Sequence, residues 1–143
     1  MTFDKIITNP NCNCLADAKE DNISRFALKT NKAKITENNF LSKWEKGENN
    51  STECKKVCSK KGVSLSIIYE DDGNLKDVVD IYKKIFPIAP GYKPVCSIVT
   101  LGDKNGLVKN SPSQNNQFHH DFYKCDNFDF SKINHITSIS LNE

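Results

Sequence analysis

The hydrophobic period of this chain changes at Gly62, and no other feature of the sequence limits the fold more. Before Gly62, apolar residues recur at the three- and four-residue spacing of an amphipathic helix. After it, Val63, Leu65 and Ile67 alternate with serines, which is the two-residue period of a strand with one buried face. A helical part is followed by a strand-rich part, so we expect an α+β fold.

Three helices are expected before the change in period. Apolar spacing predicts a helix over 17–29, a second over 37–46 and a third over 52–61, with Gly62 as the left-handed residue that ends it. Residues 1–14 contain turn-forming residues and little periodicity, which indicates an irregular N-terminal arm.

The pattern of the residues after Gly62 predicts a β-α-β unit. A strand over 63–69, a helix over 75–86 and a strand over 95–101 follow one another, with enough intervening chain for a right-handed parallel crossover. The Asn105-Gly106 turn predicts a short antiparallel partner for the preceding strand. Further strands are expected over 118–123 and 136–141. We therefore expect N-terminal helices, a β-α-β unit and further strands in a small mixed sheet, within a single domain of residues 1–143.

Charge and hydropathy exclude some classes of function. Lys and Arg total 20, but Arg25 is the only arginine, so the side chain that best forms paired hydrogen bonds to phosphate and guanine is nearly absent. This argues against nucleic-acid binding. No apolar run approaches the ~18 residues of a membrane span, and the N-terminus lacks the apolar core of a secretion signal. We expect a cytoplasmic protein, and hence free cysteines.

The cysteines and histidines suggest a metal site without matching the spacing of a known one. Zinc takes four tetrahedral ligands, and the candidates are Cys12, Cys14, His119, His120 and Cys125. Packing is the alternative explanation for each cysteine.

The remaining cysteines fit a packing role better. Cys54 and Cys58 lie with Val57 on the apolar face of the predicted third helix, and Cys96 lies in a predicted strand. Cys54, in a first helical turn, is also the most plausible reactive thiol, but no motif marks a nucleophile there. Zinc is the cofactor that the cysteines and histidines suggest.

Acidic residues at the expected sheet edge predict a second kind of site. If the two strands of the β-α-β unit were parallel neighbours, Asp71 and Asp72 would lie near Asp103, with His119 close by. These groups could hold Mg²⁺ in a hydrolase or nuclease. Ordinary turns have the same composition.

The segment around 118–130 is the most aromatic part of the chain, and it follows a polar loop over 110–117. Alternation places His119, Asp121 and Tyr123 on one strand face, which could bind another protein. Our leading interpretation is a small cytosolic, non-catalytic interaction or accessory protein, with a zinc-binding domain and a metal-dependent hydrolase as alternatives. Homo-oligomerisation is left open.

Overall fold

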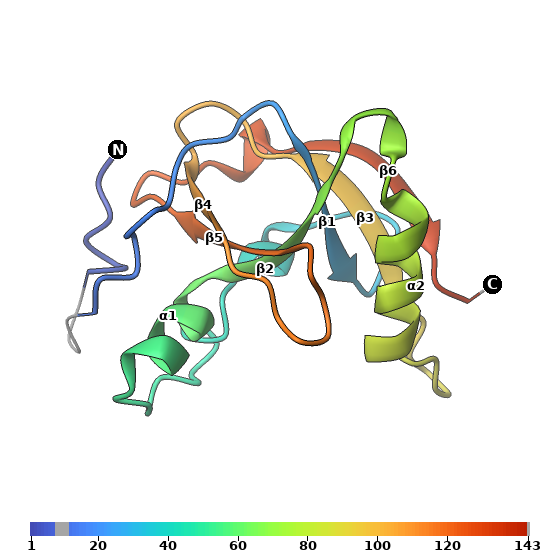
Figure 1. The fold of residues 1–143 in the computed structure, drawn as a ribbon, viewed down its shortest axis with the longest axis horizontal. Helices are drawn as coiled ribbons and strands as arrows, with labels where there is room; N and C mark the ends of the chain where they lie inside the picture. The colour runs from blue at the N-terminus through green and yellow to red at the C-terminus, as the bar shows by residue number, and fades with distance from the viewer. Residues whose placement is uncertain (8–11, 143) are drawn as a thin grey trace.

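The computed structural model describes residues 1–7 and 12–142, and its centre is a six-stranded antiparallel sheet of order β4-β5-β2-β1-β3-β6 (Figure 1). The strands are β1 (Arg25–Thr30), β2 (Val63–Ile68), β3 (Val95–Thr100), β4 (Gly106–Asn110), β5 (His119–Lys124) and β6 (Asn134–Ser140). The helices are α1 (Cys54–Lys61) and α2 (Leu75–Ile85), with the 3₁₀ turns η1 (Glu37–Phe40), η2 (Glu70–Asp72) and η3 (Phe130–Lys132). The part of residues 1–14 that falls on 8–11 lies outside the described residues.

The prediction of a helix over 17–29 is wrong, because β1 occupies its second half. Phe26, Ala27 and Leu28 are each at most 2% exposed, although consecutive residues of a strand point to opposite faces. A central strand that is covered on both faces has a continuous apolar run instead of an alternating one. Such a run can also match a helical spacing, which is why the sequence pattern misled.

The β-α-β unit and the mixed sheet are also wrong. Strands β2 and β3 do point the same way, but β1 lies between them and pairs antiparallel with both. Helix α2 therefore connects strands that are not neighbours. Strand β4 pairs with β5, not with the preceding strand β3, whose second neighbour is β6.

One face of the sheet is covered by the chain between β1 and α1. Phe26, Leu65, Val99 and Phe122 gather on this face, and Phe40 of η1 packs against them with no exposed surface. The helix expected over 37–46 is thus wrong, because only the single turn η1 forms. Its apolar residue Phe40 nevertheless enters the core.

Both helices lie on the other face. Val78 and Tyr82 of α2 pack over Ala27 and Ile98, whereas Val57 of α1 packs with residues of β5 and of the N-terminal segment. Figure 1 shows the two helices at opposite ends of this side, with the β4–β5 loop between them. The helix expected over 52–61 is confirmed as α1.

Candidate functional site

The sheet forks between β1 and β2. Their pairing runs only from Arg25 opposite Ile68 to Ala27 opposite Ser66. Both strands continue past this point, since Thr30 still pairs with β3 and Val63 still pairs with β5. Over residues 28–30 and 63–65 the two strands therefore diverge, and the sheet splits into two three-stranded halves.

A chain of hydrogen bonds closes the apex of the fork. The Tyr82 hydroxyl donates to the Ala27 carbonyl oxygen at 3.0 Å and lies 2.8 Å from Ser66 Oγ. Asn116 Nδ2 donates to Ser66 Oγ at 2.9 Å. Because the single proton of Tyr82 goes to Ala27, Ser66 must donate in the Ser66–Tyr82 bond. Burial raises the pKa of Tyr82, so its hydroxyl stays protonated as this donation requires.

The fork opens into a cleft of about 490 Å³, within the usual range for ligand sites. Its lining comes from β1, β2, α1, α2, the β4–β5 loop and the chain around η1. It comprises Leu28, Lys29, Asn39, Leu41, Ser42, Lys43, Lys46, Ser59, Gly62, Val63, Ser64, Leu65, Ser66, Tyr82, Ile85, Phe86, Ser113, Asn115, Asn116 and His119. Its polar groups are hydroxyls, amides, an imidazole and three lysines, set among apolar side chains, and no carboxylate is among the described residues that line it.

His119 is the one residue of the predicted protein-binding set that reaches the cleft. Its Nδ1 lies 2.9 Å from the Ser111 carbonyl oxygen and 3.0 Å from Ser111 Oγ. A carbonyl oxygen only accepts, so Nδ1 carries a proton and donates to Ser111. The β4–β5 loop thereby fixes the orientation of the imidazole.

Asp121 lies behind the cleft wall and is only 5% exposed. Its Oδ1 has no hydrogen-bond partner among the described residues. Burial raises the pKa of Asp121, while His119, a hydrogen bond from the Ser111 side chain, Lys109 and His120 partly oppose that shift. Ionising a buried carboxyl group whose oxygen has no hydrogen-bond partner costs free energy, and other interactions of the fold must offset that cost.

Gly62, which lines the cleft, makes room for this carboxylate. A Cβ atom at Gly62 would lie 2.8 Å from Asp121 Cβ and 2.9 Å from its Oδ1. The expectation that Gly62 is a left-handed helix terminator is wrong, because its φ of −89° and ψ of 151° are extended. Close packing, and not backbone conformation, requires glycine here.

Tyr123 is buried, so it is not available to bind another protein as the sequence pattern predicts. It is 1% exposed, and its hydroxyl donates to the Cys58 carbonyl oxygen at 2.9 Å. Alternation along β5 places His119, Asp121 and Tyr123 on one face as the sequence indicates, but α1 covers the last of them.

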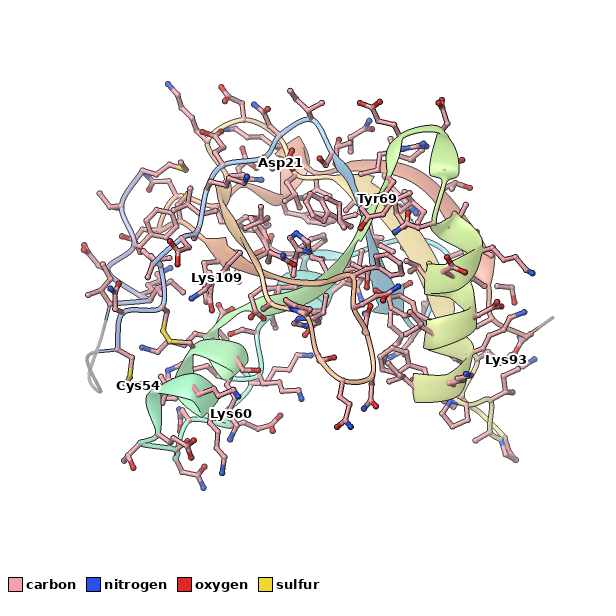
Figure 2. The ribbon with its side chains drawn as sticks, viewed as in Figure 1. Asp21, Cys54, Lys60, Tyr69, Lys93 and Lys109 are labelled. Atoms are coloured by element: carbon pink, nitrogen blue, oxygen red, sulfur yellow. A yellow bond between two sulfur atoms is a disulfide. The ribbon has the colours of Figure 1, made fainter. Side chains whose placement is uncertain are left out.

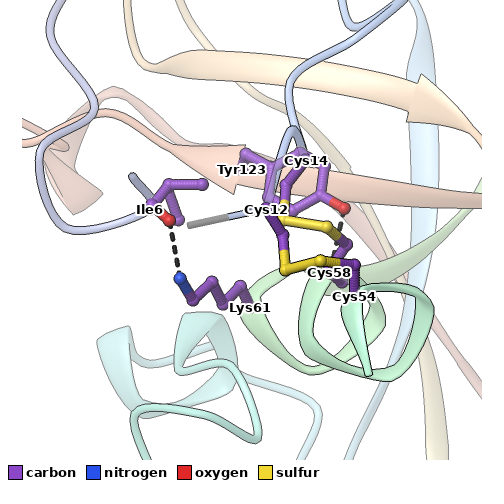
Figure 3. Close-up of a disulfide and its surroundings, with 7 residues drawn as sticks. All are labelled: Ile6, Cys12, Cys14, Cys54, Cys58, Lys61 and Tyr123. Atoms are coloured by element: carbon purple, nitrogen blue, oxygen red, sulfur yellow. Dashed lines mark hydrogen bonds between the residues drawn. A yellow bond between two sulfur atoms is a disulfide. The ribbon is translucent and has the colours of Figure 1, made fainter. Parts of the chain in front are cut away.

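Four of the six cysteines form two disulfides, Cys12–Cys54 and Cys14–Cys58, which fasten the N-terminal segment to α1 (Figure 3). Disulfides persist in oxidising environments such as the extracellular space. The expectations of a cytoplasmic location and of free cysteines at these four positions are therefore wrong.

The zinc prediction finds no support. Cys12 and Cys14 form disulfides, so neither is available as a zinc ligand. In residues 1–7 and 12–142, no group of three or more His, Cys, Asp or Glu could hold a metal ion. His120 faces away from His119 and contacts the Phe26 ring. Cys125 is buried, with its thiol 3.5 Å from the Lys104 carbonyl oxygen.

Cys96 occupies a different environment from the disulfide cysteines. It is a fully buried free thiol, as expected of a core residue, and burial raises its pKa to about 12. A thiol with so high a pKa is a poor nucleophile.

The acidic residues lie at the end of the sheet away from the fork. Asp72 pairs with Arg25, and Asp103 accepts a hydrogen bond from Asn22, so the segment before β1 separates the two loops. Figure 2 shows Asp21 and Tyr69 at this end, away from Cys54 and Lys60 of α1. No described hydrogen bond joins His119 to Asp71, Asp72 or Asp103, and no metal-holding cluster forms there among the described residues.

A smaller cavity of about 200 Å³ adjoins the N-terminal segment, with Trp44, Glu45 and Lys124 in its wall. Lys61 is 3% exposed and donates to the Ile6 carbonyl oxygen at 2.7 Å (Figure 3). Its ammonium group also lies over the Trp44 ring. Burial lowers the pKa of Lys61. These contacts hold Lys61 in a structural role, and sequence patterning missed it because the helix surface is rich in lysine.

Comparison with known proteins finds no matching family model, no matching curated protein and no matching solved structure. No helix of the described residues is long and apolar enough to cross a membrane. The cleft must therefore be interpreted from its own geometry.

Proposed function

We propose that this chain is a non-catalytic binding domain of an oxidising compartment, and that it holds part of a partner protein in the cleft between α1 and α2. The observation that supports this most is the fork, because two strands that diverge inside a disulfide-fastened fold leave a cleft in the sheet that is lined by both polar and apolar side chains. Surrounding side chains also favour binding over catalysis. The apex hydroxyls are committed to one another, and burial keeps Tyr82 protonated.

Selection from a random peptide library displayed on phage, against the oxidised protein, tests this function. Enriched peptides are then measured by fluorescence anisotropy against Ser64→Tyr and Asn115→Tyr. Both residues are exposed in the cleft lining, and they lie on β2 and on the β4–β5 loop. Ser140→Tyr is the matched control, because Ser140 is exposed on β6, away from the cleft.

We expect the two cleft variants to weaken binding at least tenfold and the control to change it less than twofold. Far-ultraviolet circular dichroism confirms that each variant is folded. Failure to enrich any peptide above a selection on an unrelated disulfide-bonded protein would overturn the proposal. So would peptides whose affinity neither cleft variant changes.

A further inference from the structure

The fork leaves strand edges without a strand partner inside the sheet. Residues 63–65 pair with β5 on one side, and residues 28–30 pair with β3 on one side, but these two stretches do not pair with each other. Along an antiparallel strand, the backbone N–H and C=O of alternate residues point toward opposite neighbours. Part of each stretch therefore directs backbone donors and acceptors into the cleft, as an edge strand does.

The charges of the cleft select what can pair with these edges. Lys29, Lys43 and Lys46 line the cleft, and no carboxylate does among the described residues. None of the three takes part in a described salt bridge, in a molecule with 18 acidic side chains available. Lys29 Nζ lies 5.4 Å from the Phe86 ring centre and 5.3 Å from the Tyr92 ring centre, and it donates to Asn31 Oδ1, so its contacts leave the positive charge without a carboxylate.

Two acidic groups adjoin the cleft without lining it. Glu45 accepts a hydrogen bond from the Ser42 backbone N–H at 3.0 Å, but it pairs with Lys124 at 2.7 Å, and the second group is buried. Asp121 lies behind Gly62, is 5% exposed and has His119, His120 and Lys109 as its charged neighbours. A ligand in the cleft meets the lysines and the neutral side chains first.

From the free strand edges and the uncompensated lysines together, we infer that the cleft binds an acidic, extended peptide segment that adds a short strand along the free edge of β2. The Tyr82–Ser66–Asn116 network blocks the apex, so pairing is limited to about three residues of β2. Main-chain hydrogen bonds provide affinity in such strand addition, and side chains provide selectivity. This inference rests on the proposed function and names its partner class.

The probe is an eight-residue peptide that alternates Glu and Thr, with a Lys and Thr peptide of the same length as control. We expect the acidic peptide to bind at least tenfold more tightly at low salt and to lose affinity as salt rises. Lys43→Glu with Lys46→Glu should weaken it at least tenfold. The control variant carries Lys55→Glu and Lys76→Glu, which change the net charge by the same amount. Both positions are exposed, lie in the first turns of α1 and α2 and are away from the cleft. The control should change the affinity for the acidic peptide less than threefold.

Backbone pairing is tested by two N-methylated forms of the acidic peptide, one methylated at odd and one at even amides. Because a strand bonds a given neighbour through alternate residues, one form should lose binding and the other should retain it. Equal retention by both forms would overturn the inference. A sulfated oligosaccharide of equal charge that binds as tightly as the peptide would also overturn it, since the cleft would then select charge alone. If library peptides bind in the cleft but the acidic peptide does not, the inference fails and the proposed function stands.

Discussion

At the scale of single residues, the buried Asp121 links the stability of the fold to pH. Burial raises its pKa above the ordinary 3.8, so the folded protein keeps this proton to higher pH than the unfolded chain does. Between the two pKa values the unfolded chain binds fewer protons, and the free energy of unfolding therefore falls as pH rises. Above the raised pKa the loss is complete.

Asp121→Asn removes this charge and keeps the side-chain shape. We expect the free energy of unfolding at pH 7 to rise by on the order of 1 kcal/mol, and its fall between pH 4 and pH 7 to flatten. Urea unfolding at several pH values measures both. The exposed Asp80→Asn is the control and should change stability by less than about 0.5 kcal/mol. A variant less stable than the natural protein at pH 7 would show that the carboxylate has a stabilising partner.

Gly62→Ala tests whether close packing requires the glycine. The new Cβ would lie 2.8 Å from Asp121 Cβ, so β2 and β5 must shift, and we expect a loss of about 1–3 kcal/mol in urea unfolding. Gly73→Ala is the matched control. Its φ of −57° suits alanine, and the nearest atom would be 3.5 Å away. Equal stability of the two variants would contradict the packing explanation.

At the scale of elements, the Tyr82 hydroxyl joins α2 to both sides of the fork. Tyr82→Phe keeps the ring in the core but leaves the Ala27 carbonyl and the Ser66 hydroxyl short of a partner. We expect a loss of about 1–3 kcal/mol, measured by thermal or urea unfolding. Tyr69→Phe is the control, because Tyr69 is 52% exposed and its hydroxyl has no described bond. A loss no larger than the control's would mean that the network does not hold the apex.

The elements themselves divide into those that sequence reasoning predicts and those it does not. The strand over 63–69, the helix over 75–86 and the strand over 95–101 are correct in type. The apolar period identifies the first two, whereas the strand over 95–101 is buried on both faces and is marked instead by Pro90, Gly91 and Pro94 before it. Strand β1 is also buried on both faces, but no proline or glycine lies just before it, so its apolar run fits a helix as well. Insertion of β1 between β2 and β3 is a contact between distant segments, and no local pattern encodes it.

The candidate site was predictable only in part. His119 and the polar loop before it were selected for their composition, and both line the cleft. The sequence places Tyr82 only within a helix over 75–86, and Ser66 only among the serines that alternate along the strand over 63–69. Their hydrogen bond depends on the packing of α2 over the fork, which a residue pattern does not contain.

At the scale of the whole molecule, the two disulfides act on nearly the same loop. They join residues 42 and 44 positions apart, so either one alone already closes nearly all of the loop that the other closes. A loop of this length contributes about 4 kcal/mol on the chain-entropy estimate. Their effects should therefore be strongly non-additive.

The disulfide prediction compares Cys12→Ala/Cys54→Ala, Cys14→Ala/Cys58→Ala and the fourfold variant. Each pair alone should lower the free energy of unfolding by less than half of the loss in the fourfold variant, as measured by urea unfolding. Additive losses would contradict a shared loop. The sequence pattern did not reveal this pairing, because Cys54 and Cys58 lie on a face that also suits packing, and connectivity depends on the tertiary fold.

The most direct test of the binding cleft is amide hydrogen exchange at residues 28–30 and 63–65, with and without the peptide that alternates Glu and Thr. In the free protein, we predict that the amides facing the fork exchange much faster than those of the Arg25–Ala27 ladder. Saturating peptide should slow alternate amides of 63–65 and leave the acidic end of the sheet unchanged. Fork amides that are already protected in the free protein, or that saturating peptide does not slow, would contradict the account.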